Sequence, residues 1–326
     1  MNTPLIQWIA AALFGLALLH TFSTKFFERL AHRHPRHAGL FHLLGEVEVV
    51  FGFWAMVLVV AMALIAGGDQ AVAYAESRQF TEPLFVCVVM VVAASRPVIE
   101  VVQALMRSLA RLLPLRECVA LTWLGLGVVP LLGSLITEPA AMTVTALIMR
   151  DRFFDKTRSD RLKYMMLGTL FVNVSIGGVL THFAAPPVLM VARTWKWDTA
   201  FMLSHFGWKA ALACIANAGI LILLNKKELA KSVASASIGR GRSPWWLNIL
   251  HLGFLALIVL TSHHPAVFIG LLLLFLGLAD ITKEYQEELK LKESLLVAFF
   301  LAGLVVLGGL QGWWLKPLVA SLSETA

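Results

Sequence analysis

Residues 118–149 read CVALTWLGLGVVPLLGSLITEPAAMTVTALIM, an apolar run whose only charged side chain is Glu138. Basic residues stand on both sides of this run: Arg116, Arg150, Arg152, Lys156 and Arg158. Basic flanks mark the cytoplasmic side of a membrane segment. The run is therefore expected to enter the membrane and to return to the side from which it entered.

The second half of the run is too short to cross a bilayer. It has 11 residues from Pro139 to Met149, which reach ~16 Å as an α-helix, whereas the hydrocarbon core is about 30 Å thick. The turn Thr137-Glu138-Pro139 should therefore lie near mid-membrane, as the tip of a re-entrant hairpin. Non-helical backbone is tolerated at that depth only where protein or a water-filled cavity surrounds it.

The composition of the whole chain indicates a membrane protein. Of its 326 residues, 59% are hydrophobic and 14% are charged, whereas about 25% of the residues in soluble domains are charged. The net charge of +7 fits basic loops beside apolar spans better than nucleic-acid binding. All three cysteines fall inside apolar segments, which argues against a disulfide framework: Cys87, Cys118 and Cys214.

The other apolar runs give eight further membrane segments, at residues 4–22, 39–66, 83–95, 164–192, 206–224, 245–262, 264–280 and 294–312. Lysine and arginine are concentrated in every second connection, at residues 23–38, 96–117, 150–163, 225–244 and 281–293. The positive-inside rule places these connections in the cytoplasm and the N-terminus outside. We therefore expect an all-α, multi-pass protein of the cell inner membrane, with an amphipathic interfacial helix at residues 98–113.

A second interrupted segment follows the hairpin, at residues 164–192. Its centre reads NVSIGGVLTHFAAPP (residues 173–187), which places two glycines and two prolines inside an apolar run. Both residue types disfavour a continuous helix, so a discontinuous helix is predicted. The alternative is a helix that ends at Gly177 and is followed by a surface loop.

Two interrupted segments at similar depth are typical of a transporter binding site. A half-helix that begins at Pro139 would direct free N–H groups and a positive dipole end toward the tip. The backbone before it, residues 133–137, is expected to be unwound and to offer carbonyl oxygens to a cation. The side chains that could complete an oxygen-ligand shell are Thr137, Glu138, Thr143, Thr145, Asn173, Ser175 and Thr181.

Several of these residues also have structural interpretations. Glu138 could be a solvated loop residue, although a carboxylate inside a membrane is by default a functional hypothesis. Thr143 and Thr145 could bond back to the preceding helical turn.

Three further titratable residues are candidate proton relays: Glu46, Glu48 and His182. The two glutamates cannot share one helix face, so a role for both is not expected, and one could simply reach water at the cytoplasmic end. His182 could equally be a structural histidine. Since the sequence has no His-Glu-x-x-His, Gly-x-Ser-x-Gly, P-loop or Rossmann motif, we expect no enzymatic activity, no cofactor and no metal beyond a transported cation.

The motifs GSLITEPAAMT (residues 133–143) and NVSIGGVLTHFAAPP (residues 173–187) resemble the putative sodium/proton antiporter family of the ion transporter superfamily. The resemblance runs along essentially the whole chain. It implies two inverted repeats, each with three spans, a re-entrant hairpin, a broken helix and a final span. It also implies that one half of the ion site is formed by Thr137, Glu138, Pro139, Thr143, Asn173, Gly177, Gly178 and Thr181.

The resemblance divides the chain into a first repeat at 1–224, a cytoplasmic linker at 225–244 and the start of a second repeat at 245–326. The charge alternation agrees, because it gives the first three spans of the two repeats opposite directions. Relatives are expected to continue into a second hairpin and a second broken helix. The second repeat is therefore expected to be incomplete within these 326 residues. A monomer of this chain alone is not expected to catalyse exchange.

The expected function is secondary transport, by a sodium (cation)/proton antiporter or by the N-terminal part of one. Its partners would be the lipid bilayer, sodium ions and protons. Assembly into a homo-oligomer is a further possibility. One alternative is a carrier of a small anion, because a helix N-terminus also suits oxyanions. A second alternative is a membrane scaffold subunit that transports nothing.

The charge alternation predicts that a cysteine introduced in the linker, Ser232→Cys, is protected from an impermeant thiol reagent added to intact cells. Labelling should appear only after the membrane is permeabilised, because the linker would face the cytoplasm. Labelling from outside in intact cells would overturn the assigned orientation of every span.

Overall fold

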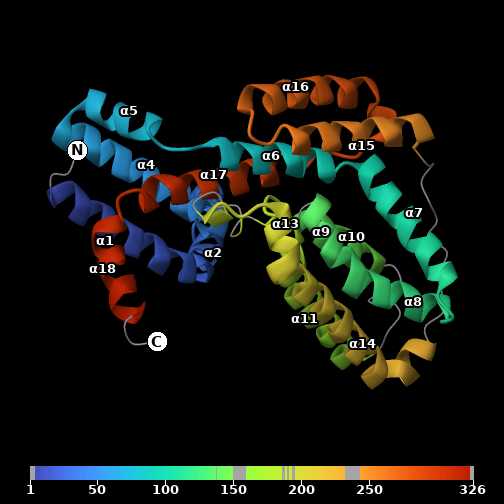
Figure 1. Ribbon diagram of the computed structural model, residues 1–326. Coiled ribbons are helices and arrows are strands. Elements are labelled where there is room, and N and C mark those ends of the chain that lie inside the picture. Colours follow the sequence, from blue (N-terminus) through green and yellow to red (C-terminus); the bar gives the residue numbers. More distant parts are fainter. Residues whose placement is uncertain are drawn as a thin grey trace. The chain divides into compact units, whose positions relative to one another are not determined.

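The computed structural model describes residues 4–136, 138–149, 159–185, 188, 191–192, 195–231 and 243–323. Within these residues every regular element is a helix (Figure 1). Six helical stretches among them are long and apolar enough to cross a membrane: Pro4–Phe22, Val47–Ala66, Glu117–Leu135, Asp160–Leu180, Thr199–Leu229 and Leu291–Gly308. Two shorter apolar helices are Trp245–Leu260 and Pro265–Ile281. The predicted class, an all-α polytopic membrane protein, is confirmed.

The chain divides into two compact units. Unit 1 comprises Met1–Cys87 with Lys292–Ala326, and unit 2 comprises Val88–Leu291. Each unit contains its own cluster of buried apolar side chains. The elements of unit 1 are α1 (Pro4–Phe22), α2 (Thr24–Arg33), η1 (Pro35–His37), α3 (Ala38–Gly45), α4 (Val47–Ala66), α5 (Gly68–Glu76), α17 (Leu291–Gly308) and α18 (Gly312–Ser323), and α6 (Thr81–Ala93) leads from unit 1 into unit 2.

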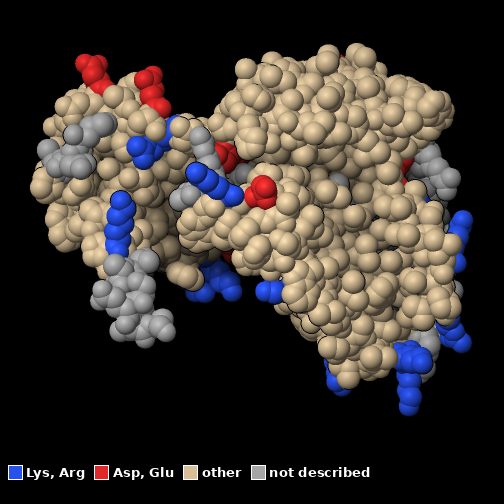
Figure 2. All heavy atoms as spheres, in the orientation of Figure 1, with Lys and Arg blue, Asp and Glu red and all other residues tan. Residues whose placement is uncertain are grey.

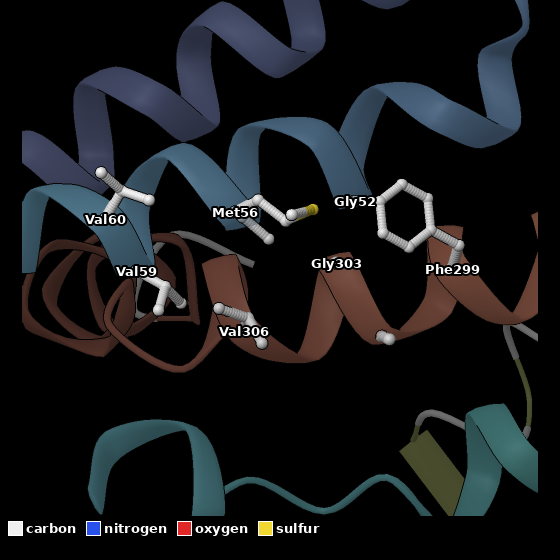
Figure 3. A pocket seen from close by; sticks show the side chains of 9 residues that line it. Gly52, Met56, Val59, Val60, Phe299, Gly303 and Val306 are labelled. Atoms are coloured by element: carbon white, nitrogen blue, oxygen red, sulfur yellow. The ribbon is translucent and has the colours of Figure 1, made fainter. Parts of the chain in front are cut away.

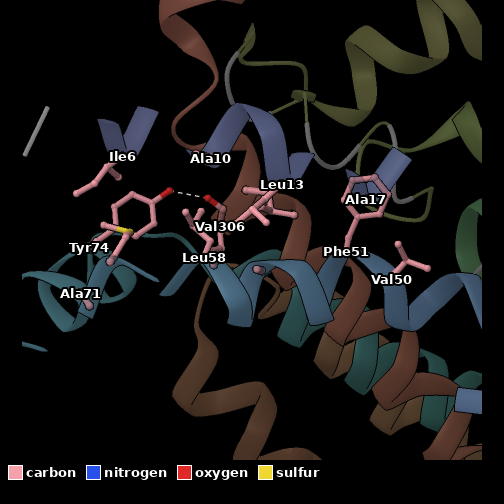
Figure 4. Packing of buried hydrophobic residues seen from close by; sticks show 13 residues of the cluster. Ile6, Ala10, Leu13, Ala17, Val50, Phe51, Leu58, Ala71, Tyr74 and Val306 are labelled. Atoms are coloured by element: carbon pink, nitrogen blue, oxygen red, sulfur yellow. Dashed lines mark hydrogen bonds between the residues drawn. The ribbon is translucent and has the colours of Figure 1, made fainter. Parts of the chain in front are cut away.

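Helices α1, α4 and α17 form the core of unit 1. The buried side chains of α1 recur every three or four positions, as a helix with one packed face requires: Ile6, Ala10, Leu13 and Ala17. Figure 4 shows these side chains between α1 and α4. In the same cluster the Tyr74 hydroxyl of α5 donates a hydrogen bond to the Val306 carbonyl of α17. The ring of His20 at the end of α1 accepts a hydrogen bond from Trp54 Nε1 (3.1 Å).

Helices α4 and α17 run parallel to each other. Lys292 Nζ lies 3.2 Å from Glu46 Oε1 at their first turns, and Phe299 meets Gly52 further along. The parallel direction agrees with the charge alternation, which predicts that both segments run from the inside to the outside. Their sidedness itself stays a prediction.

The prediction of one span over residues 39–66 is wrong, because a break separates α3 from α4. Glu46, which lies between the two helices, has an extended backbone (φ −81°, ψ 120°). Helix α2 packs against α3, and Gly45 lies against the α2 backbone at Thr24 and Glu28. This packing keeps α3 from continuing along the axis of α4.

Unit 2 contains the predicted hairpin and the predicted broken helix. Its elements are α7 (Arg96–Leu112), α8 (Glu117–Trp123), η2 (Leu124–Val128, a π-helical turn), α9 (Val129–Ile136), α10 (Glu138–Met149), α11 (Asp160–Gly177), η4 (Gly178–Leu180), α13 (Thr199–Met202), η5 (Leu203–Gly207, also π-helical), α14 (Trp208–Lys231), α15 (Trp245–Leu260), α16 (Pro265–Ile281) and η6 (Lys283–Tyr285).

The hairpin consists of two antiparallel helical arms. The first arm, α8–η2–α9, is unbroken from Glu117 to Ile136 and is ~30 Å long at 1.5 Å per residue. The second arm, α10, lies against it with Ala141 opposite Gly133 and Met149 opposite Gly125. The depth of the tip in a membrane stays a prediction.

The backbone at residues 133–136, which we expected to be unwound, is helical. Helix α9, to which these residues belong, packs against both α10 and α11. This packing stabilises the helical conformation as far as Ile136.

The polar contacts of unit 2 agree with the predicted directions of the spans. Helix α14 is antiparallel to α11, since Asn217 contacts Asn173 (3.0 Å) whereas Asn225 contacts Met165 (3.7 Å). Figure 2 shows that lysine and arginine side chains gather over the end of unit 2 where α7 and α14 end. This is the end that the basic connections predict to be cytoplasmic.

The crossing of α4 and α17 has no room for a side chain at its centre. A Cβ atom on Gly303 would collide with the backbone of Phe51 and Gly52, and a Cβ atom on Gly52 would collide with the Phe299 ring. Figure 3 shows the Phe299 ring beside Gly52, next to an apolar hollow of about 240 Å³ that Met56 and Val60 help to line.

We predict that Gly303→Ala lowers the free energy of unfolding by ~1–3 kcal/mol, the usual cost of overpacking, because the obstructing atoms are backbone. Thermal unfolding of the purified protein in detergent measures this change. The control is Gly308→Ala on the same helix, where an added Cβ meets nothing within 4 Å. Equal melting temperatures for the two variants would contradict the close crossing.

Candidate functional site

Ser134 of α9 joins the hairpin to the broken helix. Its hydroxyl donates a hydrogen bond to the Gly177 carbonyl (2.7 Å) and accepts one from the Leu180 amide (3.0 Å). Its own carbonyl accepts a hydrogen bond from Thr181 Oγ1 (2.7 Å). Ser134 is fully buried, and a buried polar group left without a partner costs about 1–3 kcal/mol. The hairpin therefore supplies the polar partners that the backbone of the broken helix has lost.

The broken helix is interrupted inside the protein. Helix α11 ends at Gly177, one 3-10 turn follows, and residues 181–185 are non-helical. Thr181, Ala184 and Ala185 are all buried, so the alternative of a surface loop is wrong for residues 181–185. Helical backbone is present again at Val188, Val191 and Ala192.

Two adjacent glycines allow the hairpin and the break to approach closely. A Cβ atom on Gly177 would collide with the backbone carbonyl group of Pro130 in α9. A Cβ atom on Gly178 would collide with the carboxylate of Glu138. The first contact sets the distance between two backbones, whereas the second leaves space for a charged side chain.

Glu138 is the first residue of α10, and its half-buried carboxylate lies over Gly178. Among the described residues this carboxylate has no hydrogen-bond or ion-pair partner. Two influences on its charge oppose each other. The N-terminal dipole of α10 favours the ionised form, and withdrawal from water favours the protonated form of a carboxylate. The position therefore suits a group that binds either a proton or a cation.

Thr145 and Asn173 bind carbonyl groups of the π-helical turn η2. Thr145 Oγ1 donates to the Gly125 carbonyl (2.9 Å), across the hairpin rather than back along its own helix. Asn173 Nδ2 donates to the Leu126 carbonyl (2.7 Å). A π-helical turn shifts the backbone hydrogen-bond register, and these two side chains supply partners for its carbonyl groups.

Asn173 links three helices through all of its polar side-chain atoms. Besides Leu126, its Nδ2 donates to the Cys214 carbonyl (3.0 Å), and its Oδ1 accepts from Asn217 Nδ2 (3.0 Å). In this arrangement Asn173 holds α11 between η2 and α14.

Ser175 lies apart from the other predicted residues. It is exposed and bonds back to the Phe171 carbonyl (2.9 Å). Thr137 lies outside the described residues, as do the side chains of Pro139 and Thr143, whose backbones belong to α10.

The candidate relay residues are divided between the two units. His182 lies within the break. Its Nδ1 is 2.9 Å from Thr199 Oγ1, and its ring is stacked on His263 at a centroid distance of 6.3 Å. Glu46 and Glu48 belong to unit 1, where Glu46 pairs with Lys292 (3.2 Å) and Glu48 is exposed.

The geometry thus brings together Glu138, Gly177, Gly178 and Thr181 from the predicted set and adds Ser134, which sequence reasoning did not single out. The only hint in the sequence is that Ser134 is a lone serine in an apolar arm. The local sequence does not identify its hydrogen-bond partners, which are 43 to 47 residues away.

Comparison with known protein families gives a match over nearly the whole chain. The family model described as "Putative Na+/H+ antiporter" matches residues 5–326. No curated protein and no solved structure matches the chain.

We predict that Gly177→Ala lowers the free energy of unfolding by ~1–3 kcal/mol, because the Pro130 backbone cannot move aside. Gly178→Ala should unfold at nearly the control temperature, because a flexible glutamate side chain can turn away. The control is Gly168→Ala in the same helix, where an added Cβ meets nothing within 4 Å. Thermal unfolding in detergent ranks the three variants, and equal losses at positions 177 and 178 would contradict the described contacts.

Proposed function

The chain belongs to the putative Na+/H+ antiporter family, and from that premise we propose that it exchanges sodium ions for protons where the hairpin tip meets the broken helix. The family points to a transporter. The observation that carries the proposal is the Glu138 carboxylate, which lies over Gly178 without a partner among the described residues.

In this proposal one carboxylate binds the proton and the sodium ion in turn. Withdrawal from water favours a bound proton, whereas an approaching cation favours the ionised form. Since both ligands need the same oxygen atoms, they compete, and competition is the simplest basis for exchange. Oxygen atoms at this junction, including the Thr181 hydroxyl and the C-terminal carbonyls of α9, are the hard ligands that a sodium ion would accept.

The remaining residues have supporting roles in the proposal. Gly178 keeps space for the carboxylate, and Asn173 holds the elements around it. Thr137 and Thr143 stay candidate ligands, and His182, one residue after Thr181, is the relay candidate nearest to the junction along the chain. Ser175, Glu46 and Glu48 are further candidates whose surroundings in the structure add no support.

The proposal extends to location and assembly. Multiple apolar spans and the family support a multi-pass membrane protein, and the basic connections favour the inner membrane with residues 23–38, 150–163 and 225–244 in the cytoplasm. The inverted-repeat order and a homo-oligomer are parts of the same proposal. A small-anion carrier is not favoured by the family, and a negative charge at Glu138 would repel an anion.

We predict that Glu138→Gln abolishes sodium-driven proton movement, because an amide neither releases a proton nor carries the charge that a cation requires. The assay uses the full-length natural protein in proteoliposomes that contain a pH-sensitive dye, to which sodium is added from outside.

The matched control is Glu76→Gln, which removes an exposed carboxylate at the end of α5 and should exchange at the wild-type rate. Size-exclusion profiles and melting temperatures show that both variants are folded. Full exchange by a folded Glu138→Gln variant would rule out the assigned site.

A further inference from the structure

Helix α7 has an outer face that the rest of unit 2 leaves uncovered. The chain bends by 67° between α6 and α7, so if α6 crosses the bilayer near its normal, α7 lies close to the membrane plane. The buried side chains of α7 recur at four-residue intervals and form one stripe against the protein: Val98, Val102, Met106 and Ala110.

The uncovered face is divided into an apolar side and a basic side. Leu105 is 45% exposed and Leu112 is 79% exposed. Their separation of seven positions is about two helical turns, so both lie on one edge of the helix. Arg107 and Arg111, four residues apart, share the opposite edge, ~120° away at 100° per residue. Helix α7 therefore has one side packed against protein, one apolar side and one basic side.

Arg107 and Arg111 have no acidic partner among the residues that the structure describes. At the start of α7, Arg96 is paired with Glu100 (2.8 Å), and Glu100 also accepts a hydrogen bond from the Ser243 amide (2.9 Å). Arg107 and Arg111 lie in the second half of α7, and Figure 2 shows lysine and arginine side chains gathered over the end of unit 2 where α7 ends.

We infer that this face of α7 binds the headgroup of an anionic phospholipid. Leu105 and Leu112 enter the acyl-chain region, and the guanidinium groups of Arg107 and Arg111 hold the phosphate. Arginine suits this role because its planar group donates paired hydrogen bonds to phosphate oxygens. Leucines so exposed would be costly in water, whereas at the boundary of headgroup and hydrocarbon both sides of the helix are satisfied.

The test is independent of transport. Short-chain phosphatidylglycerol is titrated into the full-length protein in neutral detergent, and the melting temperature is followed. Wild-type protein should be stabilised in a saturable manner. Each basic residue near an anionic lipid surface contributes roughly 5-fold in affinity. Arg107→Gln with Arg111→Gln should therefore raise the half-saturating lipid concentration by ~25-fold. The pair Arg107→Lys with Arg111→Lys should show an intermediate affinity, because lysine keeps the positive charge but not the paired hydrogen bonds.

The charge-matched control is Lys209→Gln with Lys316→Gln, which removes two exposed basic residues from α14 and α18 and should respond as the wild type does. Phosphatidylcholine and inorganic phosphate should produce no comparable shift. Raising the salt concentration should weaken the wild-type response. This part of the experiment uses wild-type protein only and so does not depend on the folding of any variant. An unchanged response of the double glutamine variant, a salt-independent response, or an equal shift with phosphatidylcholine or inorganic phosphate would overturn the inference.

Discussion

The hydrogen bonds of Ser134 are the constraint on which the rest of the site depends. A helix that stops inside a membrane protein exposes backbone groups that water cannot reach, and one hydroxyl here pairs with the Gly177 carbonyl and the Leu180 amide together. Because Ser134 is near the end of α9 and Glu138 begins α10 four residues later, both belong to the tip of the hairpin. The contact that stabilises the break therefore also helps to place the carboxylate over Gly178. The hydrogen bonds of Ser134 thus both stabilise the break and help to form the candidate site.

The neighbouring polar side chains extend this arrangement into a rigid assembly of hairpin, α11 and α14. Each hydrogen bond between membrane helices contributes only ~0.6 kcal/mol on average, but Thr145 and Asn173 act on consecutive carbonyls of the same π-helical turn. Asn173 also reaches α14 through Cys214 and Asn217. The close backbone approach at Gly177 is possible because glycine has no side chain, and these hydrogen bonds help to keep the helices from separating.

The sequence predicts the features that depend on local composition. Apolar runs and alternating basic connections predict the spans, and the glycines at 177 and 178 predict the break. Features that depend on distant partners could not be predicted: the helical backbone up to Ile136 rests on packing against α10 and α11, and the interruption at Glu46 rests on α2. Ser175 is different, because helical periodicity already places it on the face opposite Asn173 and Gly177, and its exposure follows from that spacing.

The central claim is that Glu138 exchanges a bound proton for a sodium ion, and proton release on sodium binding tests it most directly. Purified full-length protein in weakly buffered detergent solution, with a pH indicator, receives sodium chloride or, as an ionic-strength control, choline chloride. The account predicts saturable proton release with sodium alone and none from folded Glu138→Gln protein. Sodium binding without proton release, or equal release from Glu138→Gln, would contradict it.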